Sequence, residues 1–339
     1  MLLTRDKFRQ GVFERDNHKC VFCDKPAKDA HHIMERRLFS DGGYYILNGA
    51  SVCEEHHILC ETTEITTQEV REACGIEKII LPEDFYEDQV YDKWGNICLP
   101  NGNRLKGELF FDESVQKILK KGNKLDLFIS QVKYPRTRHC TWSDGMNSDD
   151  KIHKDMTHFQ GKRVIVSLKM DGENSTVYSD YFHARSIDGR NHESRNWVKN
   201  FVSGFQYDIP DNWRICGENL YAEHSIKYDN LKSYFYGFSV WNDKNECLSW
   251  DQTQEWFQLL GIISVPVLYD GIYDEEKIKS LYSEDKWETM EGYVIRLAES
   301  FSYFDFKNSV AKFVRKNHVQ TAKHNWQSQK IIPNKLEEN

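Results

Sequence analysis

Several features are missing from this chain of 339 residues, and each absence excludes a class of protein. No stretch approaches the roughly 18 consecutive apolar residues that a membrane-spanning helix needs. The first residues are charged and lack the apolar core of a secretory signal. Proline is scarce, with seven residues, and there is no low-complexity tract or evident internal repeat, so we do not expect a solenoid. These absences predict a cytoplasmic protein with no membrane partner.

The chain also lacks an excess of basic residues. It has 45 Lys and Arg against 53 Asp and Glu, and its net charge is −8. A protein that coats nucleic acid through bulk charge is usually basic, so this balance argues against a packaging protein. An enzyme with a local cationic groove remains compatible with it. Hydrophobic residues make up 39% of the chain, which is too many for wholesale disorder and enough for packed cores.

Nine cysteines occur in a chain without an export signal, which favours free thiols or metal ligands over disulfides. Two pairs have the spacing of metal ligands: Cys20 with Cys23, and Cys53 with His56. Each pair can hold one ion from a tight turn, and the four side chains together form the Cys3His set that tetrahedral Zn(II) prefers. We predict a zinc site here, with scattered buried thiols as the alternative.

Histidines lie between and after these zinc-ligand pairs. His31 and His32 are adjacent, Asn48 precedes the second pair, and His57 follows it. The arrangement resembles that of HNH endonucleases, whose ββα-metal fold is braced by zinc. The resemblance implies that His32 is a general base oriented by Asn48, and that His31 and His57 hold a catalytic divalent ion. A neutral imidazole can accept a water proton near pH 7, while the cation stabilises charge on the phosphate.

The charge of residues 1–75 does not decide whether this part of the chain is a nuclease. Residues 1–75 carry ten Lys and Arg against thirteen Asp and Glu, a net charge of −3. An acidic module binds duplex DNA poorly by itself. The sequence therefore allows either an active nuclease or a zinc-stapled adaptor that helps to place a substrate.

The order of predicted elements indicates an α+β protein with much antiparallel sheet. We expect an HNH-like zinc module over residues 1–75, a connecting region over 76–125, a catalytic domain over 126–328 and a polar tail over 329–339. The stretch 331–339 is expected to be loose. Helices are predicted over 113–121 and 251–260, and strands over 163–168, 175–178, 233–240, 292–297 and 311–315.

A lysine motif, Lys169–Met170–Asp171–Gly172, follows the predicted strand 163–168. A lysine at a strand end beside a glycine turn can project into a cleft, but such a motif alone is common by chance. Further segments follow it in order along the chain and make the pattern specific. They are His183–Ser186, Cys216–Tyr221, Tyr234–Phe238, Glu291–Arg296 and Ala311–Arg315.

This ordered set resembles the covalent nucleotidyltransferases, and most closely the ATP-dependent RNA ligases of the phage T4 second-type class. The resemblance covers about 126–328 and implies an antiparallel-sheet adenylation domain that uses ATP with Mg(II) or Mn(II). Too few residues follow this region for the OB domain of DNA ligases and capping enzymes, which favours an RNA ligase. A DNA ligase or capping-type enzyme, and an HNH endonuclease with a nucleotide-binding second domain, are the alternatives.

The resemblance implies three successive transfers. Lys169 attacks the α-phosphorus of ATP and forms lysyl-AMP, AMP passes to a 5′-phosphate end of RNA, and a 3′-hydroxyl displaces it, in RNA repair. Strands that contain DNA remain open as partners. Asp171 would orient Lys169 or a metal water. The other implied roles are Asn174 at the metal or in the strand-joining step, Arg185 at the ribose and phosphate end, Glu218 at the ribose hydroxyls, Phe238 stacked on adenine, Glu291 at magnesium and Lys312 at the α-phosphate.

Charge around the lysine gives further expectations. An amine attacks phosphorus only when neutral, and the ordinary lysine pKa is about 10.4. We expect Lys312 and a bound metal to lower the pKa of Lys169. The family's last motif often has a second lysine where this chain has Val314, and Arg315 is the substitute cation. The residues predicted to line a groove for the phosphate backbone, with a solvated helix face as the alternative, are Lys117, Lys120, Lys121, Lys124, Lys133, Arg136, Arg138 and His139.

Overall fold

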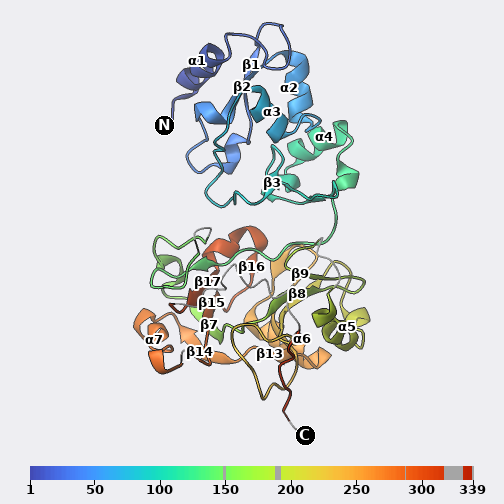
Figure 1. The fold of residues 1–339 in the computed structure, drawn as a ribbon, viewed down its shortest axis with the longest axis vertical. Coiled ribbons are helices and arrows are strands. Elements are labelled where there is room, and N and C mark those ends of the chain that lie inside the picture. The colour runs from blue at the N-terminus through green and yellow to red at the C-terminus, as the bar shows by residue number, and fades with distance from the viewer. Residues whose placement is uncertain (148–149, 188–191, 287, 317–330, 338–339) are drawn as a thin grey trace. The chain divides into compact units, whose positions relative to one another are not determined.

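The computed structural model describes residues 1–147, 150–187, 192–286, 288–316 and 331–337. The chain forms two compact units, residues 1–132 (unit 1) and 133–339 (unit 2), which are described separately (Figure 1). Both units contain helices and antiparallel strands, so the α+β prediction is confirmed. In these described ranges, no helix combines the length and the apolar character that crossing a membrane requires.

The first half of unit 1 is a small sheet with helices packed against it. Its two strands pair antiparallel and a helix follows the second strand directly, which gives a ββα order. The first helix approaches the sheet closely at Gly49, where an added Cβ would lie 2.5 Å from Val12 and 2.7 Å from Phe8. The elements are α1 (Arg5–Arg15), β1 (Asp29–His32), η1 (Arg36–Leu38), η2 (Ile46–Asn48), β2 (Gly49–Val52), α2 (Glu54–Glu61) and α3 (Thr67–Ala73), where η marks a 3-10 helix.

The second half of unit 1 is built around the buried carboxylate of Asp92. This carboxylate accepts hydrogen bonds from the backbone of Trp94 and Asn96 and from the guanidinium of Arg104, at 2.9–3.0 Å. These bonds close the turn between the first two strands of a three-stranded antiparallel sheet. The helix predicted over 113–121 is confirmed with these bounds. The elements are β3 (Val90–Tyr91), β4 (Ile97–Cys98), β5 (Arg104–Leu105), η3 (Glu108–Phe111), α4 (Glu113–Lys121) and η4 (Leu125–Leu127).

Two sheets form the frame of unit 2. The first has the strand order β14-β7-β15-β17-β6, and its pairs are antiparallel except β17 with β6. It comprises β14 (Val267–Ile272), β7 (Arg163–Leu168), β15 (Gly292–Leu297), β17 (Val310–Val314) and β6 (Arg138–His139). The second has the order β16-β12-β11-β10-β8-β9, with β13 beside β11. It comprises β16 (Phe301–Ser302), β12 (Glu246–Cys247), β11 (Phe235–Trp241), β10 (Arg214–Asn219), β8 (Glu173–Val177), β9 (Phe182–Ala184) and β13 (Ile263–Ser264).

Helices of unit 2 have local signals at their ends. The helix predicted over 251–260 begins one residue earlier, with a capping box of Ser249 and Gln252, and ends at Gly261 in the left-handed conformation. Its residue Phe257 packs on β11 at Gly237, where an added Cβ would lie 2.6 Å from the ring. The elements are α5 (Asn196–Val202), α6 (Trp250–Leu260), α7 (Glu275–Lys279), η5 (Thr157–Phe159), η6 (Glu193–Arg195), η7 (Gln206–Asp208), η8 (Glu284–Lys286) and η9 (Tyr303–Asn308).

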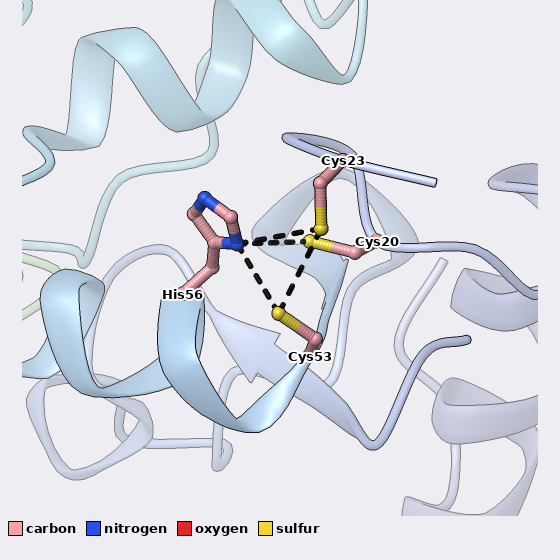
Figure 2. Close-up of side chains that lie close together, drawn as sticks. All are labelled: Cys20, Cys23, Cys53 and His56. Atoms are coloured by element: carbon pink, nitrogen blue, oxygen red, sulfur yellow. Dashed lines mark hydrogen bonds between the residues drawn. The ribbon is translucent and has the colours of Figure 1, made fainter. Parts of the chain in front are cut away.

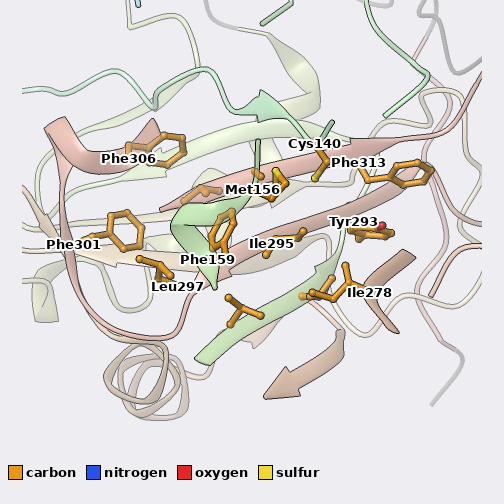
Figure 3. Packing of buried hydrophobic residues seen from close by; sticks show 14 of the residues in the cluster. Cys140, Met156, Phe159, Ile278, Tyr293, Ile295, Leu297, Phe301, Phe306 and Phe313 are labelled. Carbon is orange, nitrogen blue, oxygen red and sulfur yellow. The ribbon is translucent and has the colours of Figure 1, made fainter. Parts of the chain in front are cut away.

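The main core of unit 2 draws side chains from both sheets (Figure 3). Val164 and Val166 of β7 point into this core, together with Ile295 of β15 and Trp241 of β11. The residue between the two valines, Ile165, is equally buried but belongs to a different cluster of apolar residues. The strand β7 is therefore apolar on both faces, which explains the continuous run that predicted it.

Most predicted strands of unit 2 are confirmed. The strands over 163–168 and 292–297 have the predicted bounds, and those predicted over 175–178, 233–240 and 311–315 differ from the structure by one or two residues at their ends. Such end shifts are ordinary, because propensity defines boundaries poorly.

The expectation of a loose segment after residue 331 is wrong for residues 331–337. Asn334 is 2% exposed. Its side-chain amide donates to the Leu220 carbonyl (2.8 Å), and its side-chain oxygen accepts from the Tyr228 N–H (2.9 Å). Residues 338–339 lie outside the described residues. Polar composition suggested a tail here, but one buried asparagine fixes the segment to the loop after β10.

Candidate active site and metal centres

Lys169 follows β7, at the point where this strand pairs with β15. The register places Leu168 opposite Tyr293, so Lys169 lies opposite Gly292, and Glu291 comes one residue further along at the same sheet end. The Lys169 N–H donates to the Gly292 carbonyl (3.0 Å), and Lys169 Nζ lies 2.6 Å from Glu291 Oε2. Strand pairing thus brings together two side chains that are 122 positions apart in the sequence.

The Lys169 amine faces a cavity of about 680 Å³ in unit 2. This volume suits a ligand of several hundred daltons. Residues of both sheets contribute to the walls, which mix cationic, acidic and aromatic side chains. The predicted site residues that line it are Lys169, Asn174, Arg185, Glu218, Phe238, Glu291 and Lys312.

Lys312 reaches the cavity from β17, where it pairs with Val294 of β15. Its Nζ lies 3.2 Å from Asp150 Oδ1, and the other carboxylate oxygen of Asp150 lies 3.3 Å from His139 Nε2. Burial lowers the pKa of Lys312 below its ordinary value, and the charge of Asp150 offsets this only in part. Lys312 is therefore a paired cation in the cavity wall.

Carboxylates surround the Lys169 amine. Burial by itself would lower the pKa of Lys169, but the charges of Glu291 and Glu218 outweigh it and raise the pKa above its ordinary value. The lowering expected from Lys312 is not found, because the partner of Lys312 is Asp150 and the nearest charge to Lys169 is negative. Burial raises the pKa of Glu218 to about 8, although the charge of Lys169 acts in the opposite direction.

Asp171 does not belong to the described cavity lining, although it lies two residues from Lys169. Its carboxylate accepts from the backbone N–H and hydroxyl of Ser225 (2.8 and 2.6 Å) and from the Ile226 N–H (2.9 Å). Its own N–H donates to the Tyr228 hydroxyl (3.0 Å). These contacts hold the loop after β10 against the lysine motif.

Residues 162–314 match the family model for RNA ligase. This ligase segment contains the lysine motif and the seven predicted lining residues, from Lys169 to Lys312. A comparison with curated proteins finds no significant match.

Solved RNA ligases resemble this chain remotely. Naegleria gruberi RNA ligase with PPi is 21% identical, with a TM-score of 0.38, over 50% of this chain and 54% of that one. A lysine-to-alanine mutant of the same enzyme with ATP and Mn is 19% identical, with a TM-score of 0.36, over 47% and 52%. An archaeal ATP-dependent RNA ligase is 17% identical, with a TM-score of 0.40, over 55% and 48%. The chain spans about half the length of each.

Sequence reasoning missed an ion pair in the wall of the cavity at Lys169. Glu173 accepts from Arg195 Nε at 2.7 Å, and both side chains are at most 10% exposed. The alternation of side chains along β8 was an available signal for Glu173, which follows the lysine motif directly. Arg195 enters from a short 3-10 helix and had no such signal. His224, from the loop that Asp171 holds, also lines the cavity.

The cations predicted around the ligase motifs are only partly brought together. Val314 lines the cavity, whereas Arg315 is not among the described lining residues. Lys133 and Arg136 line the cavity, but His139 is fully buried beside Asp150 and cannot contribute to an open groove. Four further predicted cations belong to unit 1: Lys117, Lys120 and Lys121 of helix α4, and Lys124 after it. Lys117 pairs with Glu113 at 3.8 Å on an exposed face.

The predicted zinc ligands converge in unit 1 (Figure 2). Nδ1 of His56 lies 3.6 Å from the sulfurs of Cys20 and Cys23 and 3.1 Å from that of Cys53, and the sulfurs of Cys23 and Cys53 are 3.9 Å apart. Two sulfurs bound to one tetrahedral zinc would lie about 3.8 Å apart. Burial raises the pKa of Cys53, but hydrogen bonds from His56 lower it to about 6, toward the thiolate that binds metal. The donor set therefore fits zinc.

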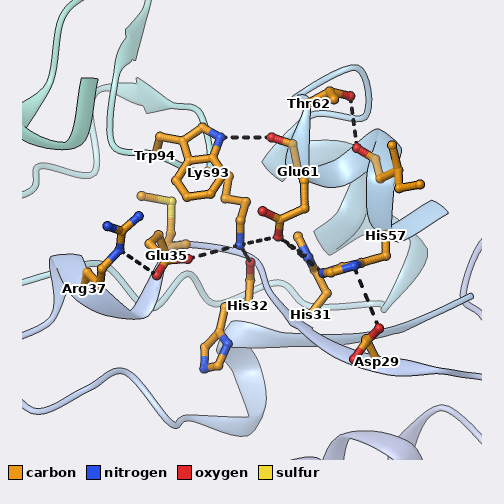
Figure 4. A network of polar contacts seen from close by, with 12 residues as sticks. Asp29, His31, His32, Glu35, Arg37, His57, Glu61, Thr62, Lys93 and Trp94 are labelled. Atoms are coloured by element: carbon orange, nitrogen blue, oxygen red, sulfur yellow. Dashed lines mark hydrogen bonds and ion pairs between the residues drawn. The ribbon is translucent and has the colours of Figure 1, made fainter. Parts of the chain in front are cut away.

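A second group of possible ligands lies at the other end of α2. Ligand atoms of His31, His57 and Glu61 all lie within 4.8 Å of one another. Glu61 Oε1 is 3.4 Å from His31 Nδ1 and 3.3 Å from His57 Nε2 (Figure 4). Burial, followed by the charge of Lys93, lowers the pKa of His31 to about 3. The structure therefore brings both predicted divalent-ion ligands to one carboxylate.

His32, the predicted general base, points away from this group. Adjacent strand residues face opposite sides of the sheet, and the His32 ring stacks on Phe8 at 4.5 Å. Burial lowers the pKa of His32 to about 4. Asn48, expected to orient it, instead donates to the Met34 carbonyl (3.0 Å) and accepts from the Met34 N–H (2.9 Å).

Proposed function

We propose that this chain is an ATP-dependent RNA ligase whose nucleophile is Lys169. The observation that carries the proposal is the 2.6 Å pairing of Lys169 Nζ with Glu291 in a cavity that Arg185, Glu218 and Lys312 also line. The RNA ligase family match over residues 162–314 supports it. The catalytic domain that we propose over 126–328 contains all of these residues.

The first step places the α-phosphorus of ATP beside Lys169. Phe238 offers a ring for adenine, and Glu218 offers an acceptor for the ribose hydroxyls. Arg185 and Lys312 supply positive charge for the phosphates. The Lys169 amine then forms a phosphorus–nitrogen bond while the bond between the α-phosphorus and the bridging oxygen breaks, and pyrophosphate leaves.

Lys169 must lose a proton before it attacks, and its carboxylate neighbours oppose this loss. Glu291 has the oxygen ligands that Mg(II) or Mn(II) prefers, so this residue fits such an ion. When bound, the ion supplies positive charge that stabilises the phosphate oxygens. With the ion bound, Glu291 would pair with the ion instead of the Lys169 ammonium group. The amine would then be free to lose its proton. Glu218, with a pKa of about 8, can hold a proton near neutral pH.

The later steps join RNA ends. We propose that AMP passes from Lys169 to a 5′-phosphate and that a 3′-hydroxyl attacks this activated end and releases AMP. Lys133 and Arg136 line the same cavity and can contact the strand's phosphates. We propose that the chain acts in RNA repair. Strands that contain DNA are the competing substrates to be tested.

We also propose that residues 1–75 form an HNH-like module whose Cys20, Cys23, Cys53 and His56 hold a structural zinc ion. The ββα order of unit 1 and the near-tetrahedral spacing of the four ligand atoms support this assignment. A closed Cys3His site leaves no open position for a reacting group, so this zinc would stabilise the module rather than catalyse.

Incubation with α-labelled ATP and Mg(II) tests the ligase proposal. We expect covalent labelling of the wild-type chain, and a loss of at least about 1000-fold in Lys169→Ala, because this change removes the proposed nucleophile. Lys162→Ala, an exposed lysine outside the cavity, is the matched control and should label normally. Absence of labelling in the folded wild-type chain would contradict the proposal, and labelling from GTP would favour a capping enzyme.

The labelled chain then tests the substrate. We expect AMP to transfer to a nicked duplex with a 5′-phosphate on RNA and to give a sealed strand. A DNA nick sealed faster than the RNA nick would favour the DNA ligase alternative.

A further inference from the structure

Lys93 places a buried ammonium group inside unit 1. Its side chain is 4% exposed, and its Nζ lies 3.0 Å from the His32 carbonyl, 3.1 Å from Glu61 Oε1 and 3.5 Å from Glu35 Oε2 (Figure 4). An ammonium group has three N–H donors. One N–H donates to the His32 carbonyl, and the carboxylates of Glu61 and Glu35 form ion pairs with the same ammonium group.

The position of Lys93 is fixed by its neighbours in the turn between β3 and β4. The Lys93 carbonyl accepts from the Glu35 N–H at 2.9 Å. The indole of Trp94 donates to the Glu61 carbonyl at 2.9 Å, and the Trp94 N–H donates to Asp92. The turn is therefore attached to the segment after β1 and to the end of α2. These contacts fix the backbone from which the Lys93 side chain extends into the cluster.

The same oxygen of Glu61 that approaches His31 and His57 is the one that approaches Lys93. A divalent ion coordinated by this oxygen would lie within a few ångströms of the ammonium group. Like charges at that separation in a buried site repel strongly. Lys93 instead supplies one positive charge that is paired with the carboxylates of Glu61 and Glu35.

We infer that the Lys93 ammonium is the resident cation of the His31–His57–Glu61 cluster, in the place where a nuclease of the resembled family would hold its divalent ion. Unit 1 then has one metal site, the Cys3His site, and does not cleave nucleic acid by a divalent-ion mechanism. The orientation of His32 agrees with this inference, because its carbonyl binds Lys93 while its ring stacks on Phe8 on the other face. The cluster joins β1, α2 and the β3–β4 turn.

Metal binding by the full-length, zinc-loaded chain tests the inference. Titration with Mn(II), followed by electron paramagnetic resonance, counts divalent sites in the wild type and in His57→Ala. We expect equal counts, because any Mn(II) bound in the ligase cavity is common to both. Lys93→Met removes the ammonium group and keeps an unbranched side chain. We expect it to gain one Mn(II) site, at least tenfold tighter than any residual binding by the wild-type cluster, and Lys93→Met/His57→Ala to lose that site.

Two results would overturn the inference. One is a Mn(II) site, or a Mn(II)-dependent nuclease activity, that the wild type has and His57→Ala lacks. The other is a folded Lys93→Met chain that gains no site, since Lys93 would then not be what excludes the metal. Zinc content and circular dichroism report folding. If Lys93→Met loses its zinc, Lys93→Gln is used in its place. The comparison of Mn(II) counts in the wild type and in His57→Ala tests the inference without any change at Lys93.

Discussion

At the residue scale, the carboxyl group of Glu218 lies in the same cavity wall as Lys169 and Glu291 and has a pKa of about 8. The ordinary glutamate pKa, which applies to the unfolded chain, is about 4.3. A raised pKa in the folded state gives stability that is fully present below pH 4.3 and is lost as the pH rises through 8. Near neutral pH, the burial of Glu218 therefore lowers the free energy of unfolding.

Glu218→Gln removes this titration and keeps the shape of the side chain. We expect the variant to melt above the wild type by about 2 °C or more at pH 8, with a difference that shrinks toward pH 5. Labelling with ATP should fall about tenfold or more, because an amide is a weaker partner for the ribose hydroxyls. Differential scanning calorimetry across pH measures the first effect. The exposed residue Glu299 supplies the control Glu299→Gln, and a pH-independent gain in melting temperature would contradict the assignment.

The sequence predicted which residues line the cavity better than it predicted their pKa values and ion-pair partners. Lys169, Glu291 and Lys312 could be placed because each lies in an ordered motif on a strand. The raised pKa of Lys169 could not be predicted, because it depends on which carboxylates the strand register places beside it. Asp150, which pairs with Lys312, lies in a polar loop, where composition gives no distance to any other residue.

At the element scale, β7 was predictable and the segment over 331–337 was not. A continuous apolar run bounded by turn residues marks a strand that is buried on both faces. The segment over 331–337 is polar, and its order depends on the hydrogen bonds of Asn334 with residues more than 100 positions away. Such partners leave no periodic signal in the sequence.

Asn334→Ala tests whether this C-terminal segment stabilises the ligase domain. The change leaves the part-buried Tyr228 N–H and the buried Leu220 carbonyl without this partner, so we expect a loss of about 1–3 kcal/mol. The melting temperature should fall by several degrees in thermal unfolding followed by circular dichroism. Lys335→Ala changes the next, exposed side chain and should have little effect. Equal melting of the two variants would show that the segment contributes nothing.

At the scale of the whole molecule, the proposed zinc ligands lie in unit 1 and the cavity at Lys169 lies in unit 2. The sequence indicated this division through the separate clustering of cysteines and ligase motifs. It did not indicate that residues 76–125 form part of unit 1, because the contacts of Lys93 and Trp94 with β1 and α2 join segments that no motif connects.

Zinc removal should affect the two units differently. Cys20 and Cys53 belong to the unit 1 core, so a chelator should lower the unfolding temperature of unit 1 by about 10 °C or more. Labelling of Lys169 should persist once Mg(II) is restored. Calorimetry and labelling of the same sample measure both effects. Cys74→Ser, a cysteine outside the ligand set, is the control, and loss of labelling together with zinc would contradict this division of roles.

The strand that precedes Lys169 has fully buried side chains at three successive positions, and their alternation sends them into two separate apolar clusters. A strand that is packed on both faces has little freedom to shift, so the backbone at Lys169 keeps a fixed position. If Lys169 is the nucleophile that we propose, nucleotide and RNA approach this fixed backbone position, and the surrounding loops accommodate the changes between successive transfers.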